Sequence, residues 1–120
     1  MSERRRLALI AVTLAAVVVL PGCGEATKTD RLSVDNGPVA DGNAITPARM
    51  ETQAGNTVEV RVRNTANDKP HGFSIDEFKV SDTIEQGETK TVTFVASKAG
   101  TYRVYCQLHP THRPAELVVS

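Results

Sequence analysis

Apolar and polar side chains alternate in several stretches of the chain. In residues 57–63, three valines at every second position alternate with threonine, glutamate and arginine, the period of a strand with one buried face. Residues 89–95 alternate in a similar way, but threonines flank Val92 and Phe94, so we expect that strand to twist or bulge. Shorter strand candidates are residues 73–75, 102–106 and 116–119.

Turn-forming residues separate these stretches. Glycine, proline and asparagine cluster at residues 54–56, 67–70, 86–87 and 99–100. No window after residue 23 has the spacing of apolar positions that a helix requires. Short strands at regular spacing therefore predict an all-β domain, and a β-sandwich in particular.

Residues 1–20 differ from the rest of the chain in charge and hydrophobicity. Residues 1–6 contain three consecutive arginines, and residues 7–20 are uncharged and mostly apolar. A run of this length is too short to span a hydrocarbon core of about 30 Å. Positive residues, then apolar residues, then a small-residue site is the order of a secretory signal, so we expect export to the periplasm or the cell exterior.

The segment after this run ends in a cysteine. Residues 20–23 (LPGC) resemble the bacterial lipobox, in which the cysteine is acylated and becomes the mature N-terminus. Pro21 departs from that pattern, and the alternative is an ordinary signal peptide with Cys23 as a spare thiol. With acylation, the chain divides into a signal peptide (1–22), a tether (23–30) and a domain (31–120), anchored to the membrane through Cys23.

Charge and cysteine content narrow the function. The net charge is zero, and removal of the signal segment would take away three arginines and one glutamate, which leaves −2. No basic patch stands out, so we expect no nucleic acid partner. Cys106 is the second of two cysteines, and if Cys23 is acylated it is a lone thiol that tends to oxidise unless a metal occupies it.

The chain's three histidines are arranged around this cysteine. His109 and His112 follow Cys106 at intervals of three residues, and His71 follows the turn at residues 67–70. Two imidazoles and a thiolate form the trigonal set that suits a copper ion in electron transfer. Only one cysteine is available in this loop, so we expect one copper per chain.

These residues also carry a resemblance to a known family. Residues 47–119 resemble the cupredoxins, small copper proteins, in four segments that occur in the family's order. The segments are Gly55-Asn56-Thr57-Val58, Asn64, His71-Gly72-Phe73 and Gly100-Thr101-Tyr102-Arg103-Val104-Tyr105-Cys106-Gln107-Leu108-His109. The resemblance implies a Greek-key β-sandwich with copper near one end, held by His71, Cys106 and His109.

The same resemblance assigns two further residues. Asn64 matches a position that often braces the ligand loop through hydrogen bonds, although it could be a simple turn residue. His112 takes the place of the family's axial methionine, where it would give copper a stronger donor, a lower potential and a more tetragonal geometry. The alternative is an exposed loop histidine that binds nothing.

The sequence leaves several functions open. The first function is one-electron transfer to a redox partner protein. The carrier would be a membrane-anchored monomer, and the electron would leave through His109. Copper storage or delivery is the second, and a copper enzyme that acts on a small molecule such as nitric oxide is the third. The remaining alternative is a β-sandwich that serves in adhesion and binds no metal, in which the histidines have no role.

Overall fold

Nine strands and one short 3-10 helix make up residues 28–120, the part of the chain that the computed structural model describes. The predicted signal peptide and Cys23 lie outside the described residues. The strands are β1 (Thr29–Val39), β2 (Gly42–Thr46), β3 (Arg49–Thr52), β4 (Thr57–Asn64), β5 (His71–Ile75), β6 (Val80–Ile84), β7 (Thr89–Val95), β8 (Gly100–Val104) and β9 (Ala115–Val119). The 3-10 helix covers Asp76–Phe78. Within the described residues no helix is long and apolar enough to cross a membrane.

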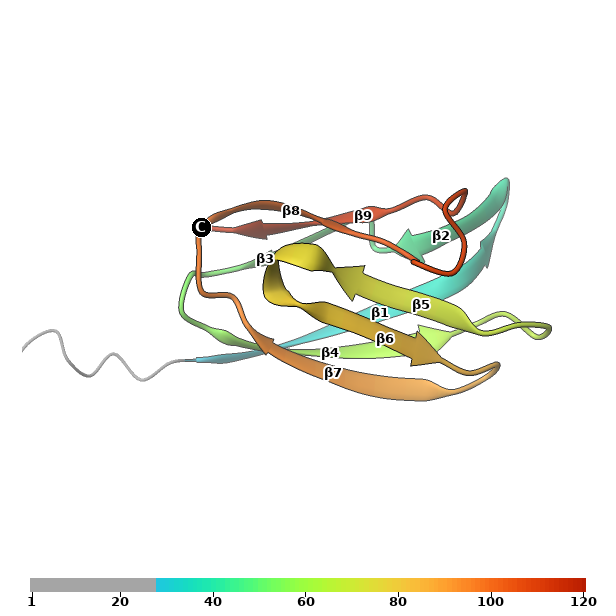
Figure 1. Cartoon of the computed structure of the whole chain (residues 1–120), viewed down its shortest axis with the longest axis horizontal. Coiled ribbons are helices and arrows are strands. Elements are labelled where there is room, and N and C mark those ends of the chain that lie inside the picture. The colour runs from blue at the N-terminus through green and yellow to red at the C-terminus, as the bar shows by residue number, and fades with distance from the viewer. Residues whose placement is uncertain (1–27) are drawn as a thin grey trace, which may run out of the picture.

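The strands form two layers (Figure 1). One sheet has the order β2-β1-β4-β7, and the other contains β3-β9-β8 with the β5-β6 hairpin beside it. Backbone hydrogen bonds between Ser74 and Tyr105 join this hairpin to the end of β8. The predicted all-β sandwich is therefore confirmed.

The core lies between the layers and follows the alternation seen in the sequence. Val58, Val60 and Val62 of β4 are buried, as are Val92 and Phe94 of β7. Because β4 and β7 pair without a break, β7 does not contain the bulge that we considered. Thr91 and Thr93, which alternate with these two residues, are exposed, which is ordinary for β-branched polar side chains on the outer face of a strand.

The strand pattern was incomplete at the start of the domain. β1, β2, β3 and β6 were not among the predicted strands, although they complete both sheets. β1 begins at Thr29, so Thr29 and Asp30, which the predicted boundaries place in the tether, belong to the first strand. β1 pairs in parallel with β4 and antiparallel with β2, which places it in the middle of its sheet.

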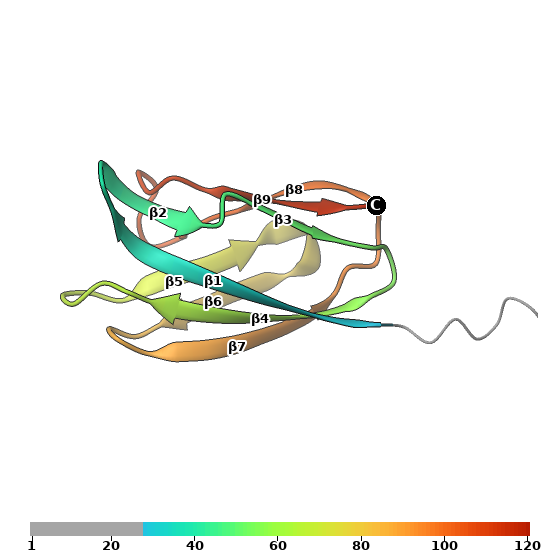
Figure 2. The ribbon, with the colours of Figure 1, turned by 180° about the vertical axis from the view of Figure 1, so that it is seen from behind.

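The two ends of the sandwich differ in what they carry (Figures 1 and 2). β1 starts at the end where β9 finishes and the C-terminus lies, which we call the tether end. The loop between β8 and β9 and the start of β5 lie at the opposite end, which we call the site end. A strand of 11 residues separates the two ends, about 35 Å at the usual rise per residue.

Candidate metal centre

Four side chains converge at the site end. They are His71, Cys106, His109 and His112, and one ligand atom from each lies within 4.8 Å of those of the others. The ring centroids of the three histidines are 4.5 to 5.1 Å apart. Three of the four residues are buried, with 0% of His71, 2% of Cys106 and 8% of His112 exposed, and His109 is partly exposed.

His71 is held by the strand that it opens. Every residue of β5 is buried, which leaves the histidine no freedom to turn toward solvent. Its Nδ1 lies 2.9 Å from Oδ1 of Asn36 on β1, and the next residue, Gly72, donates its backbone N–H to Cys106 Sγ at 3.1 Å. This last bond ties the neighbour of the first predicted ligand to the cysteine, which lies 34 positions after Gly72 in the chain.

Two consecutive turns shape the loop that carries the other ligands. The backbone N–H of His109 donates to the carbonyl of Cys106 at 3.3 Å, and that of His112 donates to the carbonyl of His109 at 3.1 Å. Pro110 occupies the second position of the second turn, where its fixed φ is favourable. Repeated turns of three residues bring Cys106, His109 and His112 to the same side of the loop.

The framework of the sandwich clamps both ends of this loop. Before it, Ser74 of β5 exchanges two backbone hydrogen bonds with Tyr105, at 2.9 and 3.0 Å. After it, the Arg113 N–H donates to the carbonyl of Asn43 at 3.0 Å, and the Arg113 carbonyl accepts from Ile45 at 3.1 Å. The loop therefore spans from the strand of His71 to the edge of the opposite sheet.

Gln107 fastens the loop to the β5-β6 hairpin. Its Oε1 accepts a hydrogen bond from the Ser74 hydroxyl at 2.7 Å, and its Nε2 donates to the carbonyl of Asp82 at 2.9 Å. The side chain passes over Gly72 so closely that a Cβ there would lie 2.0 Å from Gln107 Oε1. Because glycine has no side chain, position 72 leaves space for the side chain of Gln107 to reach the hairpin. We did not predict this role for either residue.

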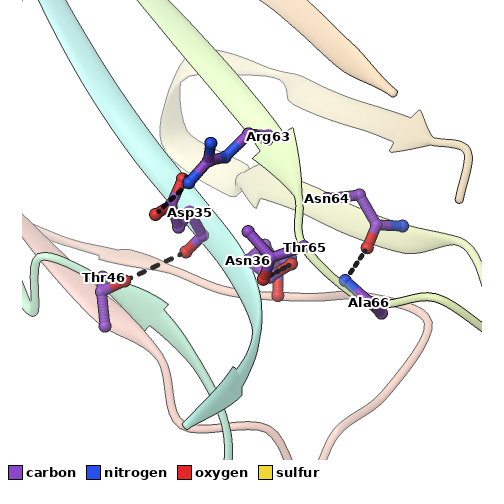
Figure 3. A network of polar contacts seen from close by, with 7 residues as sticks. All are labelled: Asp35, Asn36, Thr46, Arg63, Asn64, Thr65 and Ala66. Atoms are coloured by element: carbon purple, nitrogen blue, oxygen red, sulfur yellow. Dashed lines mark hydrogen bonds and ion pairs between the residues drawn. The ribbon is translucent and has the colours of Figure 1, made fainter. Parts of the chain in front are cut away.

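The two buried asparagines at this end play different parts. Asn64 donates to the carbonyls of Lys69 at 2.9 Å and Ile84 at 3.0 Å, and its Oδ1 accepts from the Ala66 N–H (Figure 3). It therefore holds residues 65–70, the loop that leads into His71, and no hydrogen bond within residues 28–120 joins it to the four clustered side chains. The residue that contacts His71 is Asn36, which we did not predict.

Burial sets the protonation of the histidines. Desolvation lowers the pKa of His71 to about 4, and repulsion from His112 and His109 adds to the effect. Burial also lowers the pKa of His112, with smaller contributions from His109 and Lys69. The two rings are thus neutral at neutral pH, as metal ligation requires.

The polar atoms of the cluster fit a metal ion. His71 Nε2 and His112 Nδ1 are buried without a hydrogen-bond partner. An unpartnered buried polar atom costs about 1–3 kcal/mol, so native structures retain one only for a reason such as ligand binding. Cys106 is a free, buried thiol 3.5 Å from His109 Nδ1. One thiolate with imidazoles suits copper, and zinc accepts the same atoms. The four residues could hold one copper ion.

A buried cluster of one cysteine and three histidines at the end of a Greek-key sandwich defines a protein of the copper-binding β-sandwich class. The model of the Cupredoxin-like domain matches residues 8–119, and the chain belongs to this family. None of the curated proteins matches the chain.

Solved structures agree on the fold. Auracyanin A, a blue copper protein from the green photosynthetic bacterium Chloroflexus aurantiacus, is 20% identical with a TM-score of 0.63, over 77% of this chain and 99% of its own. The metal binding domain of the Cu(I)-exporting ATPase CopA of Streptococcus pneumoniae, solved with Cu(I), is 14% identical with a TM-score of 0.65, over 77% and 86%. The copper nitrite reductase of Nitrosomonas europaea is 18% identical with a TM-score of 0.65, over 78% of this chain and 42% of its own. These three structures share the fold and differ in function, so the function of this chain must be argued from its own site.

Proposed function

We propose that this chain is an exported, membrane-anchored protein that binds one copper ion and transfers single electrons. The observation that carries the proposal is the convergence of His71, Cys106, His109 and His112 within 4.8 Å, on a framework of strands and hydrogen bonds. These residues would hold the ion, and copper would supply a one-electron couple between Cu(I) and Cu(II).

The rigidity of the site favours electron transfer. Cys106 accepts a hydrogen bond from Gly72, His71 is bonded to Asn36, and the loop is clamped at Tyr105 and Arg113. Ligands that keep their positions in both oxidation states lower the reorganisation that each transfer requires. His109 is the partly exposed member of the set and lies next to Leu108, which is 42% exposed. Electrons would pass through the His109 ring to a redox partner that docks there.

The position of the site suits a lipid anchor at the other end. The first strand starts at the tether end, opposite the cluster (Figures 1 and 2). An anchor at Cys23 would therefore leave the site end turned away from the membrane, toward the periplasm or the cell exterior. Anchoring would keep the carrier near membrane-bound partners by raising its local concentration.

The first test is the spectrum of the copper-loaded protein. We expect a visible thiolate-to-copper band and a Cu(II) electron paramagnetic resonance signal from one ion per chain. Because His112 would be a stronger donor than a thioether, His112→Met should shift the band and raise the reduction potential. An unchanged spectrum and potential would remove His112 from the ligand set, and no thiolate band in the parent protein would reject the copper site.

A second measurement separates electron transfer from copper delivery. An electron carrier should show a reversible potential and keep its copper through repeated oxidation and reduction. A delivery protein should instead lose Cu(I) rapidly to a chelator of moderate affinity. Binding of azide or nitric oxide to the oxidised protein would indicate an open coordination position and favour an enzyme.

The anchor has its own test. In cells that carry out lipoprotein processing, the parent chain should partition with membranes and incorporate labelled palmitate. Cys23→Ser should abolish the label, while Cys106→Ser, the matched change at the other cysteine, should leave it. Equal labelling of the parent and Cys23→Ser would exclude this anchor.

A further inference from the structure

The first half of β1 bonds to another strand on one side only. In a parallel ladder, alternate residues of each strand bond to the partner strand. Just before β1, the carbonyl of Lys28 accepts a hydrogen bond from the Thr57 N–H at 2.9 Å. Near its other end, the carbonyl of Asn36 accepts from the Thr65 N–H at 3.0 Å. The even-numbered residues therefore face β4, and the N–H and C=O groups of the odd-numbered residues face away from it.

β2 covers only part of that second side. It pairs with β1 from Asp35 to Val39. Thr29, Arg31 and Ser33 precede this region, and no hydrogen bond within residues 28–120 reaches their outward backbone groups. All three residues are exposed. Two backbone groups on each of three residues are thus open, which is the form of strand edge that accepts another strand.

The other two edges of this sheet are covered. On the outer side of β2, the Arg113 N–H donates to the carbonyl of Asn43 at 3.0 Å, and the Arg113 carbonyl accepts from Ile45 at 3.1 Å. β7 lies beside β6, and an ion pair of 3.2 Å between Lys90 and Asp82 joins the two strands. Proteins usually protect strand edges in such ways, so the open edge at residues 29–33 is the exception in this sheet.

The outer face of the sheet beside this edge has an unbalanced positive charge. Arg31 pairs with Glu59 at 3.2 Å. Arg63 pairs with Asp35 at 3.0 Å (Figure 3). Arg61 lies between these pairs on β4, is exposed, and has no ion pair within residues 28–120. A ligand at this edge is therefore favoured if it brings a carboxylate.

A hollow connects Arg61 to the open edge. It has a volume of about 240 Å³ and is lined by Ser33, Val34, Asp35, Arg61 and Arg63. Ser33 is the residue of β1 opposite Arg61, and its side chain is small. Neighbouring strands lie about 4.8 Å apart, so a residue placed opposite Ser33 on an added strand would lie about 10 Å from Arg61 at the backbone. A glutamate and an arginine side chain together bridge that span.

We propose that residues 29–33 bind an extended peptide segment of a partner protein as an added strand, with an acidic side chain opposite Ser33 that pairs with Arg61. Backbone hydrogen bonds to the three odd-numbered residues would supply affinity, and the pair with Arg61 would supply specificity. An inward-facing apolar side chain of the segment would pack on Leu32, which is only partly buried against the core.

The proposal is independent of copper. The open edge starts at the tether end, away from the ligand loop (Figures 1 and 2). A segment bound there would leave His109 uncovered, so one partner could hold the protein while another exchanges electrons at the site end.

Amide exchange tests whether the edge is free. The full chain, labelled with nitrogen-15 and held in detergent micelles, should exchange the amide protons of Thr29, Arg31 and Ser33 rapidly and those of Leu32 and Val34 slowly. Protection of the first three amides in the free chain would overturn the proposal, because another segment of the chain or a second copy would already cover the edge.

A designed peptide tests the binding. The probe is the pentapeptide Glu-Val-Thr-Thr-Thr with blocked ends, whose glutamate lies opposite Ser33 in antiparallel pairing. It should protect the three amides, and the same peptide with lysine in place of glutamate should bind about tenfold more weakly. Arg61→Glu should reverse this preference. An unchanged preference in Arg61→Glu, or no binding of either peptide at millimolar concentration, would overturn the proposal.

A pair of proline variants tests the place of binding. Ser33→Pro removes an outward N–H and places a ring in the path of the added strand, while every bond between β1 and β4 remains. Thr91→Pro is the matched change on β7, opposite Arg61 on its other side and also with its N–H facing away from β4. Only Ser33→Pro should abolish peptide binding. Equal effects of the two variants would overturn the proposal, and if Ser33→Pro does not fold, the charge reversal at Arg61 decides.

Discussion

The two ends of the sandwich differ in whether their polar groups have hydrogen-bond partners within the protein. At the tether end, one oxygen of Asp30 accepts hydrogen bonds from the Thr52 hydroxyl at 2.5 Å and the Asn56 amide at 3.0 Å. At the site end, His71 Nε2 and His112 Nδ1 are buried without partners. The polar groups at the first end are satisfied within the protein, while the second end has ring nitrogens without a partner, which a metal ion would satisfy.

This difference separates polar groups that stabilise the fold from polar groups that are available to a ligand. An unpartnered buried group costs about 1–3 kcal/mol, whereas a completed hydrogen bond contributes about 0.5–1.5 kcal/mol to stability. The hydrogen bonds at the tether end therefore stabilise the fold with or without metal. At the site end, the cost of the unpartnered nitrogens would be offset only when a metal binds. The effect of a substitution on stability should therefore depend on metal at the site end and not at the tether end.

The largest effect should come from removal of the thiolate. Cys106→Ser should lose the visible thiolate band and the copper-dependent gain in stability, because the hydroxyl is a poor ligand for copper. For the parent chain, that gain is about 2.7 kcal/mol when free copper is at a hundred times its dissociation constant. Chemical denaturation with and without copper measures it. Asp30→Asn, at the other end, should keep the band and the gain.

Retention of the full copper-dependent gain by Cys106→Ser would show that the stabilising ion binds elsewhere. Loss of the gain in Asp30→Asn would show that the two ends are coupled. Either result would break the separation between the ends.

The next largest effect should come from Gly72. A Cβ at this position would lie 2.0 Å from Gln107 Oε1 and 2.3 Å from its Cδ, so Gln107 must move and lose its bonds to Ser74 and Asp82. We expect Gly72→Ala to lower the free energy of unfolding by about 1–3 kcal/mol, the usual cost of overpacking, and to broaden the copper spectrum.

A double-mutant cycle identifies the partner in that clash. In a Gln107→Ala background the side chain that meets the new Cβ is gone, so Gly72→Ala should cost much less. The same cost in both backgrounds would mean that the backbone of β5, rather than Gln107, resists the change.

Strand bounds were predicted best where buried apolar residues alternate with polar ones, as in β4 and β7. β4 has valines on one face and charged side chains on the other, and its bounds were predicted within one residue. β1 is harder because its site end contains Asn36, Gly37 and Pro38, which are typical of turns. Here the parallel partner β4 and the neighbour β2 override local preference, and neither pairing is visible in the local sequence.

The cluster itself was easier to predict than its support. Cys106, His109 and His112 share one loop, and their spacing along the chain is enough to indicate a metal site. The convergence of His71 with them rests on the order of strands that the family resemblance supplied. Asn36 and Gln107 gave no sequence pattern, because their roles come from contacts across 35 and 33 positions of the chain.

A smaller effect concerns the pH dependence of the tether end. Hydrogen bonds from Thr52 and Asn56 hold the pKa of Asp30 below its usual value of 3.8. The unfolded chain therefore takes up the proton first as the pH falls, and the stability from Asp30 is complete above about pH 4 and is lost below it. The difference in unfolding free energy between the parent and Asp30→Asn should shrink over that range. A difference that stays constant down to the acid transition would show that the Asp30 carboxylate is not favoured by these bonds.

The smallest effect on stability should come from two exposed apolar residues, one at each end. Leu108 is 42% exposed beside His109, and Val95 is 52% exposed where β7 pairs with the start of β4 at the tether end. Replacing either by serine should change the unfolding free energy by no more than about 0.5 kcal/mol. Only Leu108→Ser should slow electron self-exchange, because two molecules must bring their His109 rings together and an apolar contact surface costs little to desolvate. Line broadening in mixtures of reduced and oxidised protein measures the rate of this exchange. Equal rates for the two variants would mean that electrons leave by a route other than the face around His109.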